Sequence, residues 1–288
     1  HKGQYGKKVD WIGYSLEITG ERVVARIKEE FMNEFAGLTA KILTQNTVTF
    51  SDLRSYAGKA NHVATLIRTW RPFLDQLWAA LAAKRTSNAP SGKIWVKQIS
   101  SSLLWLRAFC AQESGEIERS WYFDFYSAQG SQDIMVLDAS PFSLGGVLVE
   151  DGVLSSWFSD PLTQQDVARF GHEIGSSKGQ QTWEALVVLV AVRTWMPRWV
   201  HKRTSITLKS DNMAALAMTA KMKTNINGLI AKELAIALSK ASFSIRFLVH
   251  IPGVMNSIAD ALSRLNDPSH NFAVPALLAN VPRAQVEE

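Results

Sequence analysis

The feature that most constrains the fold is a short apolar segment that ends in an acidic residue. Ile134–Leu137 is apolar throughout, and Asp138 follows it directly. Such a run between polar residues is typical of a central β-strand that is buried on both faces. Ser140-Pro141 predicts a turn, and Gly145-Gly146 begins a neighbouring strand. An acid at the end of a buried strand is costly to desolvate unless something cationic meets it, so Asp138 either caps its turn or has a cationic partner.

The residues after this pair of strands alternate between further strands and helices. We expect strands at 153–158, 205–210 and 243–249, and helices at 181–195, from 211, at 228–240 and at 257–265. The helix at 181–195 is apolar nearly all round, which predicts deep burial, and Ser177–Gln180 fits a capping box at its start. Residues 161–177 are expected to form a polar loop, and those after 266 a loosely held tail.

Four acidic residues fall on four of these elements: Asp138, Glu184, Asp211 and Asp260. Each has a structural explanation of its own. Asp211 could cap the helix that begins there, and Glu184 could be a neutral or salt-bridged residue near a helix start. Taken together, they predict a carboxylate cluster, because acids cannot be packed together without cations between them. Oxygen-only ligand sets select Mg²⁺ or Mn²⁺, and two such ions can hydrolyse a phosphodiester.

The first 130 residues differ from the rest in charge. They hold 17 Lys+Arg and 12 Asp+Glu, whereas residues 131–288 hold 14 of each. A basic first half favours a polyanionic partner. Arg54, Lys59, Arg68 and Arg71 lie on or beside a predicted helix and could meet phosphates, although such residues also form ordinary solvated faces.

The same region predicts a hairpin followed by a helical bundle. We expect a strand at 9–18 with Gly13 inside it, a returning strand at 23–27, and an edge strand at 121–126. Helices are expected around 31–42, from a cap at Ser51, from Pro72, and at about 93–112, with a linker at 86–92.

Composition excludes several classes of protein. A single cysteine, Cys110, excludes a disulfide framework and fits a reducing, intracellular compartment, the cytoplasm or the nucleus. No apolar run reaches membrane-spanning length, so no membrane partner is expected. The sequence begins with His1 rather than Met, and we expect it to be a piece of a longer protein.

The motifs around the four acids resemble those of retrotransposon ribonucleases H. The segment 250–264, His-Ile-Pro-Gly-Val-Met-Asn-Ser-Ile-Ala-Asp-Ala-Leu-Ser-Arg, resembles the last motif of the gypsy and DIRS types. Residues 208–215 and 183–186 resemble the third and second acid motifs of the DIRS group. In the first half, Trp11-Ile-Gly-Tyr14 is similar to the primer-grip hairpin of a reverse transcriptase, and 53–59 and 71–74 to its thumb and connection.

This resemblance implies an α/β fold in three parts. Residues 131–266 would be a ribonuclease H-like domain with a mixed five-stranded sheet and flanking helices. Residues 1–130 would supply a primer-grip β-hairpin and a mostly α-helical, thumb- or connection-like region, and 267–288 a C-terminal tail. The implied function is metal-dependent endonucleolytic hydrolysis of the RNA strand of RNA·DNA hybrids, leaving 3′-hydroxyl and 5′-phosphate ends, as the C-terminal part of a retrotransposon reverse transcriptase.

The resemblance also implies site residues and partners. Two Mg²⁺ ions, which Mn²⁺ can replace, would be held by Asp138, Glu184, Asp211 and Asp260. His250 matches a mobile histidine that helps product or proton departure, although it could simply be a histidine at a strand end. Contacts with the RNA·DNA hybrid or primer-template are implied for Trp11, Gly13, Tyr14, Arg54, Lys59, Arg68, Arg71 and Asn212. The implied protein partner is the upstream palm and fingers.

Two departures from the family and several alternatives matter. A basic helical protrusion is not evident, and the Tyr-x-Asp-Asp polymerase motif is absent, so these 288 residues are not expected to polymerise. Integrases and transposases carry their Glu last, whereas Glu184 is the second of the four acids here. Proofreading exonucleases open with Asp-x-Glu, whereas this chain has Asp138-Ala-Ser140. Both classes of enzyme are therefore disfavoured. A catalytically inactive nucleic-acid-binding or scaffolding module of the same fold stays open, as does an unrelated globular protein whose acids are caps and salt bridges.

Overall fold

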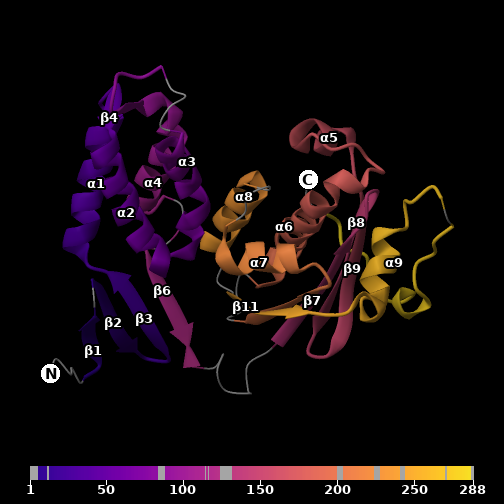
Figure 1. Ribbon diagram of the computed structural model, residues 1–288. Helices are drawn as coiled ribbons and strands as arrows, with labels where there is room; N and C mark the ends of the chain where they lie inside the picture. Colours follow the sequence, from indigo (N-terminus) through magenta and orange to yellow (C-terminus); the bar gives the residue numbers. More distant parts are fainter. Residues whose placement is uncertain are drawn as a thin grey trace. The chain divides into compact units, whose positions relative to one another are not determined.

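A computed structural model describes residues 6–11, 13–83, 88–113, 115, 117–123, 132–199, 204–223, 228–240, 244–269 and 271–286. The chain divides into two compact units, His1–Ala128 and Gln129–Glu288 (Figure 1). Among the helices of the described ranges, none has the length and apolar character needed to cross a lipid bilayer.

The first unit contains a four-stranded antiparallel sheet in the order β1-β2-β3-β6. Its strands are β1 (Lys8–Trp11), β2 (Tyr14–Thr19), β3 (Arg22–Ile27) and β6 (Glu118–Tyr122). Gly13 has a φ of +85° and separates β1 from β2, so the prediction that it lies inside one strand is wrong. Of the edge strand predicted at 121–126, Trp121 and Tyr122 lie in the edge strand β6, which begins earlier, at Glu118; residues 124–126 lie outside the described residues.

The described part of this unit also contains the helices α1 (Glu29–Leu43), α2 (Phe50–Leu66), α3 (Asp75–Ala82) and α4 (Ser100–Cys110). Their core is rich in aromatic rings; Trp70, for example, stacks on Phe109 with 5.4 Å between ring centroids. The predicted first residues of two helices are wrong. Thr49, not Ser51, caps α2 by accepting the Asp52 amide at 3.0 Å, and Pro72 lies inside the 3-10 helix η1 (Arg68–Leu74), before α3 begins.

The fourth predicted helix is also too long at its start. Its first residues form β5 (Lys93–Trp95), which pairs with β4 (Thr47–Thr49), and the short 3-10 helix η2 (Val96–Gln98). A strand partner more than forty residues away in the sequence therefore overrides the local helical periodicity.

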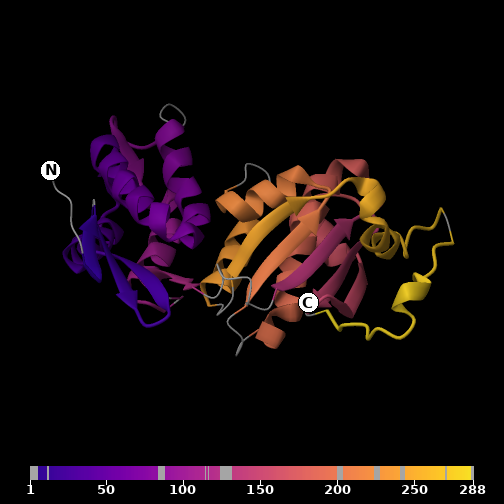
Figure 2. The same ribbon diagram turned by 90° about the horizontal axis from the view of Figure 1, so that it is seen from below.

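The second unit is built on a mixed five-stranded sheet in the order β11-β10-β7-β8-β9 (Figure 2). β7 (Gln132–Ala139), β8 (Ser143–Glu150) and β9 (Val153–Pro161) form an antiparallel meander. β10 (Ser205–Ser210) lies parallel to β7, and β11 (Ser244–His250) lies parallel to β10. The predicted central strand is confirmed as β7.

Helices cover both faces of this sheet. α6 (Gln180–Trp199), α7 (Met213–Lys221) and α8 (Gly228–Ser239) pack together, and Trp195 of α6 contacts Phe158 of β9 with 5.3 Å between ring centroids. α9 (Ser257–Ser263) covers the opposite face, where it packs against Gly145. The faces are opposite because Gly146, not Gly145, lies against Phe158, and successive residues of a strand point to opposite sides. The predicted α/β class, a mixed five-stranded sheet with flanking helices, is confirmed.

The predicted loop at 161–177 contains a short helix, α5 (Gln164–Phe170), and is therefore partly wrong. Its capping box joins Thr163 and Asp166: the Thr163 amide donates to Asp166 Oδ2 at 2.8 Å, and the Asp166 amide donates to Thr163 Oγ1 at 3.4 Å. The capping box predicted at Ser177–Gln180 is wrong, because Ser177–Gly179 forms the 3-10 helix η4, which is capped by Ser176.

The C-terminal segment packs against the second unit, which differs from the loosely held tail that the sequence predicts. Leu278, in the 3-10 helix η6 (Ala276–Leu278), is 1% exposed and lies in a cluster with Val147, Trp157 and Leu262. The indole Nε1 of Trp157 also donates to the carbonyl of Val281 at 2.9 Å.

We therefore expect Leu278→Ala to lower the free energy of unfolding of the second unit by about 2–4 kcal/mol, through loss of apolar contact and the cavity left behind. The matched control is Leu277→Ala, since Leu277 is 64% exposed and its truncation should change stability by less than about 0.5 kcal/mol. Denaturant unfolding measures both; equal effects would contradict the packing of the tail.

Candidate active site

Three of the four predicted acids meet at one edge of the sheet. Asp138 lies near the end of β7, Asp211 directly follows β10, and Glu184 projects from the first turns of α6. One carboxylate oxygen from each lies within 4.8 Å of the others. β7 and β10 are parallel neighbours, so their carboxyl ends lie at the same edge, and α6 places Glu184 above it. The predicted convergence is confirmed for these three residues.

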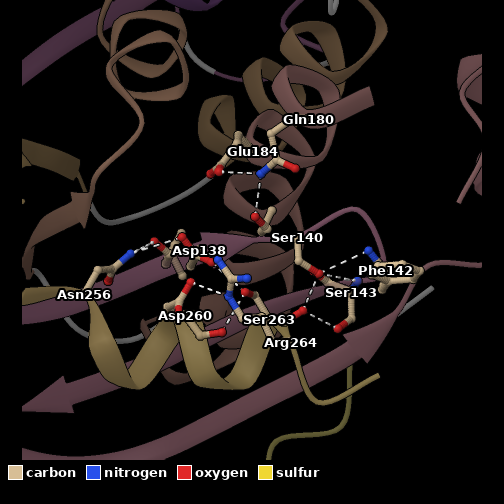
Figure 3. A network of polar contacts seen from close by, with 12 residues as sticks. Asp138, Ser140, Phe142, Ser143, Gln180, Glu184, Asn256, Asp260, Ser263 and Arg264 are labelled. Atoms are coloured by element: carbon tan, nitrogen blue, oxygen red, sulfur yellow. Dashed lines mark hydrogen bonds and ion pairs between the residues drawn. The ribbon is translucent and has the colours of Figure 1, made fainter. Parts of the chain in front are cut away.

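Asp260, the fourth acid, lies outside this three-residue group. It projects from α9, and its Oδ1 accepts a hydrogen bond from Arg264 Nε at 2.7 Å (Figure 3). Both side chains of this ion pair are more than two-fifths exposed, and such pairs contribute about 0–1 kcal/mol. The pair therefore holds Asp260 only weakly in its present orientation.

The carboxylate of Asp138 is held by both ends of α9. Ser263 Oγ donates to Asp138 Oδ2 at 2.5 Å, and Asn256 Nδ2 donates to Asp138 Oδ1 at 3.3 Å and to the Leu137 carbonyl at 3.1 Å (Figure 3). Asn256 is the N-cap residue of α9, but its side chain makes no cap hydrogen bond and is directed to β7 instead. Neither Asn256 nor Ser263 is among the site residues that the sequence predicts.

Glu184 has one oxygen with a partner and one without. Gln180 Nε2 donates to Glu184 Oε1 at 2.9 Å and to the carbonyl of Ala139 at 2.6 Å, as Figure 3 shows. Oε2 is buried and, among the described residues, has no hydrogen-bond partner. A buried carboxylate oxygen without a donor is unfavourable unless it is protonated or binds a cation. This orphan oxygen, at an all-oxygen cluster, fits a hard divalent cation such as Mg²⁺ or Mn²⁺.

The residue after Asp211, not Asp211 itself, caps the helix that follows. Asn212 Oδ1 accepts the backbone amides of Ala214 and Ala215, both at 2.9 Å, so Asn212 caps α7 and the expectation that Asp211 does so is wrong. The exposed ring of His250, the last residue of β11, has Nε2 3.1 Å from the Asp211 carbonyl oxygen. His250 therefore lies at the rim of the carboxylate cluster.

Burial raises the pKa of two of the three carboxyl groups, those of Asp138 and Glu184. It raises the pKa of Asp138 from 3.8 to about 7, with further contributions from the charges of Asp211 and Asp260, against which the Ser263 hydrogen bond acts. Burial likewise raises the pKa of Glu184 from 4.5 to about 9, with the charge of Asp138 adding to it. Both groups retain protons in the folded metal-free protein at pH values where the unfolded chain has lost them.

The difference in bound protons between the folded and unfolded states makes the stability of the protein change with pH in a definite direction. Because the folded state binds more protons, the metal-free protein should lose stability as pH rises from about 4 to about 9. A divalent cation must displace the same protons, so its affinity should rise over that range. We expect the rise in Tm that Mg²⁺ or Mn²⁺ produces to be larger at pH 8 than at pH 5.5. We also expect Glu184→Gln to flatten the pH dependence of the metal-free Tm. A cation effect that is independent of pH would contradict this account.

The predicted nucleic-acid-binding residues of the first unit fall into two groups. Trp11, Arg54 and Arg68 are exposed. The others make contacts within the unit: Lys59 forms an ion pair with Glu34, Arg71 Nε donates to the Ala64 carbonyl at 3.1 Å, and Tyr14 Oη donates to the His62 carbonyl at 3.0 Å.

Gly13 and Tyr14 together fix the β1–β2 hairpin to α2. The rings of Tyr14 and His62 stack at 4.8 Å, and a Cβ at Gly13 would lie 2.9 Å from His62 Nε2. These two residues therefore position the hairpin, at whose turn Trp11 is 59% exposed.

Comparison with known proteins gives matches among solved structures alone. No protein-family model and no curated protein matches the chain. It is similar to ribonuclease H1 from the halophilic archaeon Halobacterium salinarum NRC-1, with 16% identity, a TM-score of 0.34, and coverage of 49% of this chain and 98% of that one. It is also similar to the foamy viral protease-reverse transcriptase in complex with dsDNA, with 15% identity, a TM-score of 0.31, and coverage of 86% and 46%. The same foamy viral protein in complex with an RNA/DNA hybrid gives 13% identity and a TM-score of 0.30, with coverage of 85% of this chain and 30% of that one. The chain thus spans less than half of either foamy viral chain.

Proposed function

We propose that this chain hydrolyses the RNA strand of RNA·DNA hybrids in a reaction that depends on divalent cations, as the C-terminal part of a retrotransposon reverse transcriptase. The observation that carries the proposal is the group of three oxygens, from Asp138, Glu184 and Asp211, within 4.8 Å of one another. They lie at the edge of a mixed five-stranded sheet, the kind of sheet that the resemblance to ribonucleases H implies.

In this proposal the three carboxylates hold two Mg²⁺ ions, with Asp260 as the fourth ligand. When bound, such ions activate a water for attack on a phosphodiester and stabilise the leaving oxygen. Asp138 and Glu184 give up their protons as the cations bind. Asp260 turns toward the cluster at small cost, because both side chains of its ion pair with Arg264 are more than two-fifths exposed. The exposed ring of His250, held beside the backbone of Asp211, accepts or delivers a proton as the product leaves.

The first unit supplies contacts to the nucleic acid in the same proposal. The exposed ring of Trp11 offers a stacking surface, and the exposed guanidinium groups of Arg54 and Arg68 offer charge to phosphates. Tyr14, Gly13, Lys59 and Arg71 act by fixing the shape of this surface through their contacts within the unit. Asn212, whose side-chain oxygen caps α7, keeps its amide nitrogen for a nucleic-acid contact.

The test is cleavage of an RNA·DNA hybrid in which each strand carries a different label, with Mg²⁺, with Mn²⁺ and with a chelator. We expect cutting of the RNA strand alone, with 3′-hydroxyl and 5′-phosphate ends, and no cutting with chelator. An RNA duplex and a DNA duplex of the same sequence are the control substrates. Tight binding of the hybrid without cleavage would overturn the proposal and favour a catalytically inactive binding module.

A further inference from the structure

We propose that Ser263 is a positioning residue, which sets the carboxylate of Asp138 and the helix that carries Asp260 in the arrangement that divalent cations require. This inference rests on the proposed function and deepens it. It starts from a group of four serines, here called the serine cluster: Ser140, Ser143, Ser159 and Ser263, which lie beside or within β7, β8, β9 and α9.

Three hydroxyls of the serine cluster hold the end of α9. Ser140 Oγ and Ser143 Oγ donate to the carbonyl of Ser263 at 2.5 and 2.6 Å, and Ser159 Oγ donates to the carbonyl of Leu262 at 2.7 Å. The last carbonyl groups of a helix lack partners in the next turn, and a buried helix end needs donors from elsewhere. The sheet provides them here, so the backbone at Ser263 is fixed to β8, β9 and the turn after β7.

The fourth hydroxyl, that of Ser263, connects this fixed helix end to the candidate active site. Ser263 is fully buried, and its Oγ donates to Asp138 Oδ2 at 2.5 Å while also lying 2.9 Å from the Asp260 carbonyl. Because the backbone of Ser263 cannot shift without breaking the bonds from Ser140 and Ser143, its hydroxyl fixes the rotamer of Asp138. One residue thus joins the first acid, on the sheet, to the helix that carries the fourth.

The neighbouring Ser159 supplies a matched control. It is also buried and also donates to a carbonyl at the end of α9, but it makes no hydrogen bond to Asp138 among the described contacts. Ser159→Ala and Ser263→Ala each remove one buried hydroxyl from the same cluster. Any general loosening of α9 should therefore appear in both variants, whereas misplacement of Asp138 should appear in one.

For Ser263→Ala we expect the dissociation constant for Mn²⁺ to rise about tenfold to a hundredfold, as happens when groups that orient metal ligands are removed. We also expect kcat for hybrid cleavage to fall with little change in KM. Ser263→Cys, which keeps a weak donor on a somewhat larger side chain, should give a smaller loss. Ser159→Ala should lower Tm to a similar extent as Ser263→Ala but leave Mn²⁺ binding within about twofold of the unchanged chain, since it contacts no ligand.

Calorimetric titration with Mn²⁺ alone, at one pH, separates the outcomes without any measurement of cleavage, and Tm confirms that each variant is folded. If the unchanged chain binds no Mn²⁺, the proposed function fails. If it binds Mn²⁺ and Ser263→Ala binds equally well, this inference alone is overturned. Equal weakening by Ser159→Ala and Ser263→Ala would also overturn it, because the role of Ser263 would then be that of the helix end in general.

Discussion

Asp138→Asn is expected to lower the rate of RNA cleavage by about a thousandfold or more, which corresponds to about 4 kcal/mol of transition-state stabilisation. Asn has the size of Asp but no negative charge, so the variant loses one of the three carboxylates of the group. The same change removes a buried acid whose pKa is raised to about 7. The metal-free protein should therefore be at least as stable at pH 8 as the unchanged chain. Affinity for the hybrid in chelator should change by less than about threefold, since substrate binding is assigned to other residues.

The matched control is Asp151→Asn. Asp151 lies in the turn between β8 and β9, at the end of β8 remote from Gly145, with a φ of +50°. Asn tolerates this left-handed conformation well. The two variants thus make the same chemical change in the same unit. Unchanged cleavage by Asp138→Asn, or an equal loss in Asp151→Asn, would remove Asp138 from the catalytic assignment.

Gly145→Ala is expected to destabilise the second unit by about 3 kcal/mol and to abolish cleavage. A Cβ at this position would overlap the backbone of α9: it would meet the amide nitrogen of Ser263, the carbonyl oxygen of Ala259 at 2.6 Å and the carbonyl carbon of Leu262 at 2.8 Å. All three are main-chain atoms, so the whole helix must move. Because Asp138 is the register partner of Gly145, the displacement occurs where α9 holds that carboxylate.

Gly228→Ala tests the same substitution where space is free. Gly228 begins α8, and a Cβ there would meet nothing within 4 Å. Alanine favours the helix over glycine by up to about 1 kcal/mol, so this variant should be neutral or stabilised. Denaturant unfolding and hybrid cleavage of both variants give the comparison. A Gly145→Ala chain as stable and active as Gly228→Ala would show that α9 does not pack as closely as described.

The sequence was informative where the signal was local. The apolar run before Asp138 and the alternation before Asp211 identify β7 and β10, and two parallel strands that end in acids bring those acids together without further information. Glu184 was identifiable because it is the only acid in a helix otherwise filled with buried apolar residues. Local periodicity therefore predicted the individual strands and the positions of the three acids that converge, whereas the mixed five-stranded sheet was implied by the resemblance to ribonucleases H.

Other features of the fold and site were not predicted, because they depend on residues far apart in the sequence or lack an apolar pattern. The contacts of Asn256 and Ser263 with Asp138 join residues 118 and 125 positions apart, so no window of sequence contains them. α5 was missed because none of its residues is buried, which leaves no apolar stripe. Its capping box and the left-handed Gly171 at its end were the available signals.

The protonation of Glu184 and Asp138 also bears on the order in which a newly synthesised chain folds and binds cations. With Glu184 neutral and Asp138 partly neutral near pH 7, the sheet and α9 close over the acids without needing a counter-ion. Small zinc domains behave differently, because they stay unfolded until the metal arrives. Here folding comes first, and uptake of the cation is a separate, reversible step that releases protons. Cation supply would then govern the activity of molecules that are already folded, and bound cation would add to the stability of the folded state.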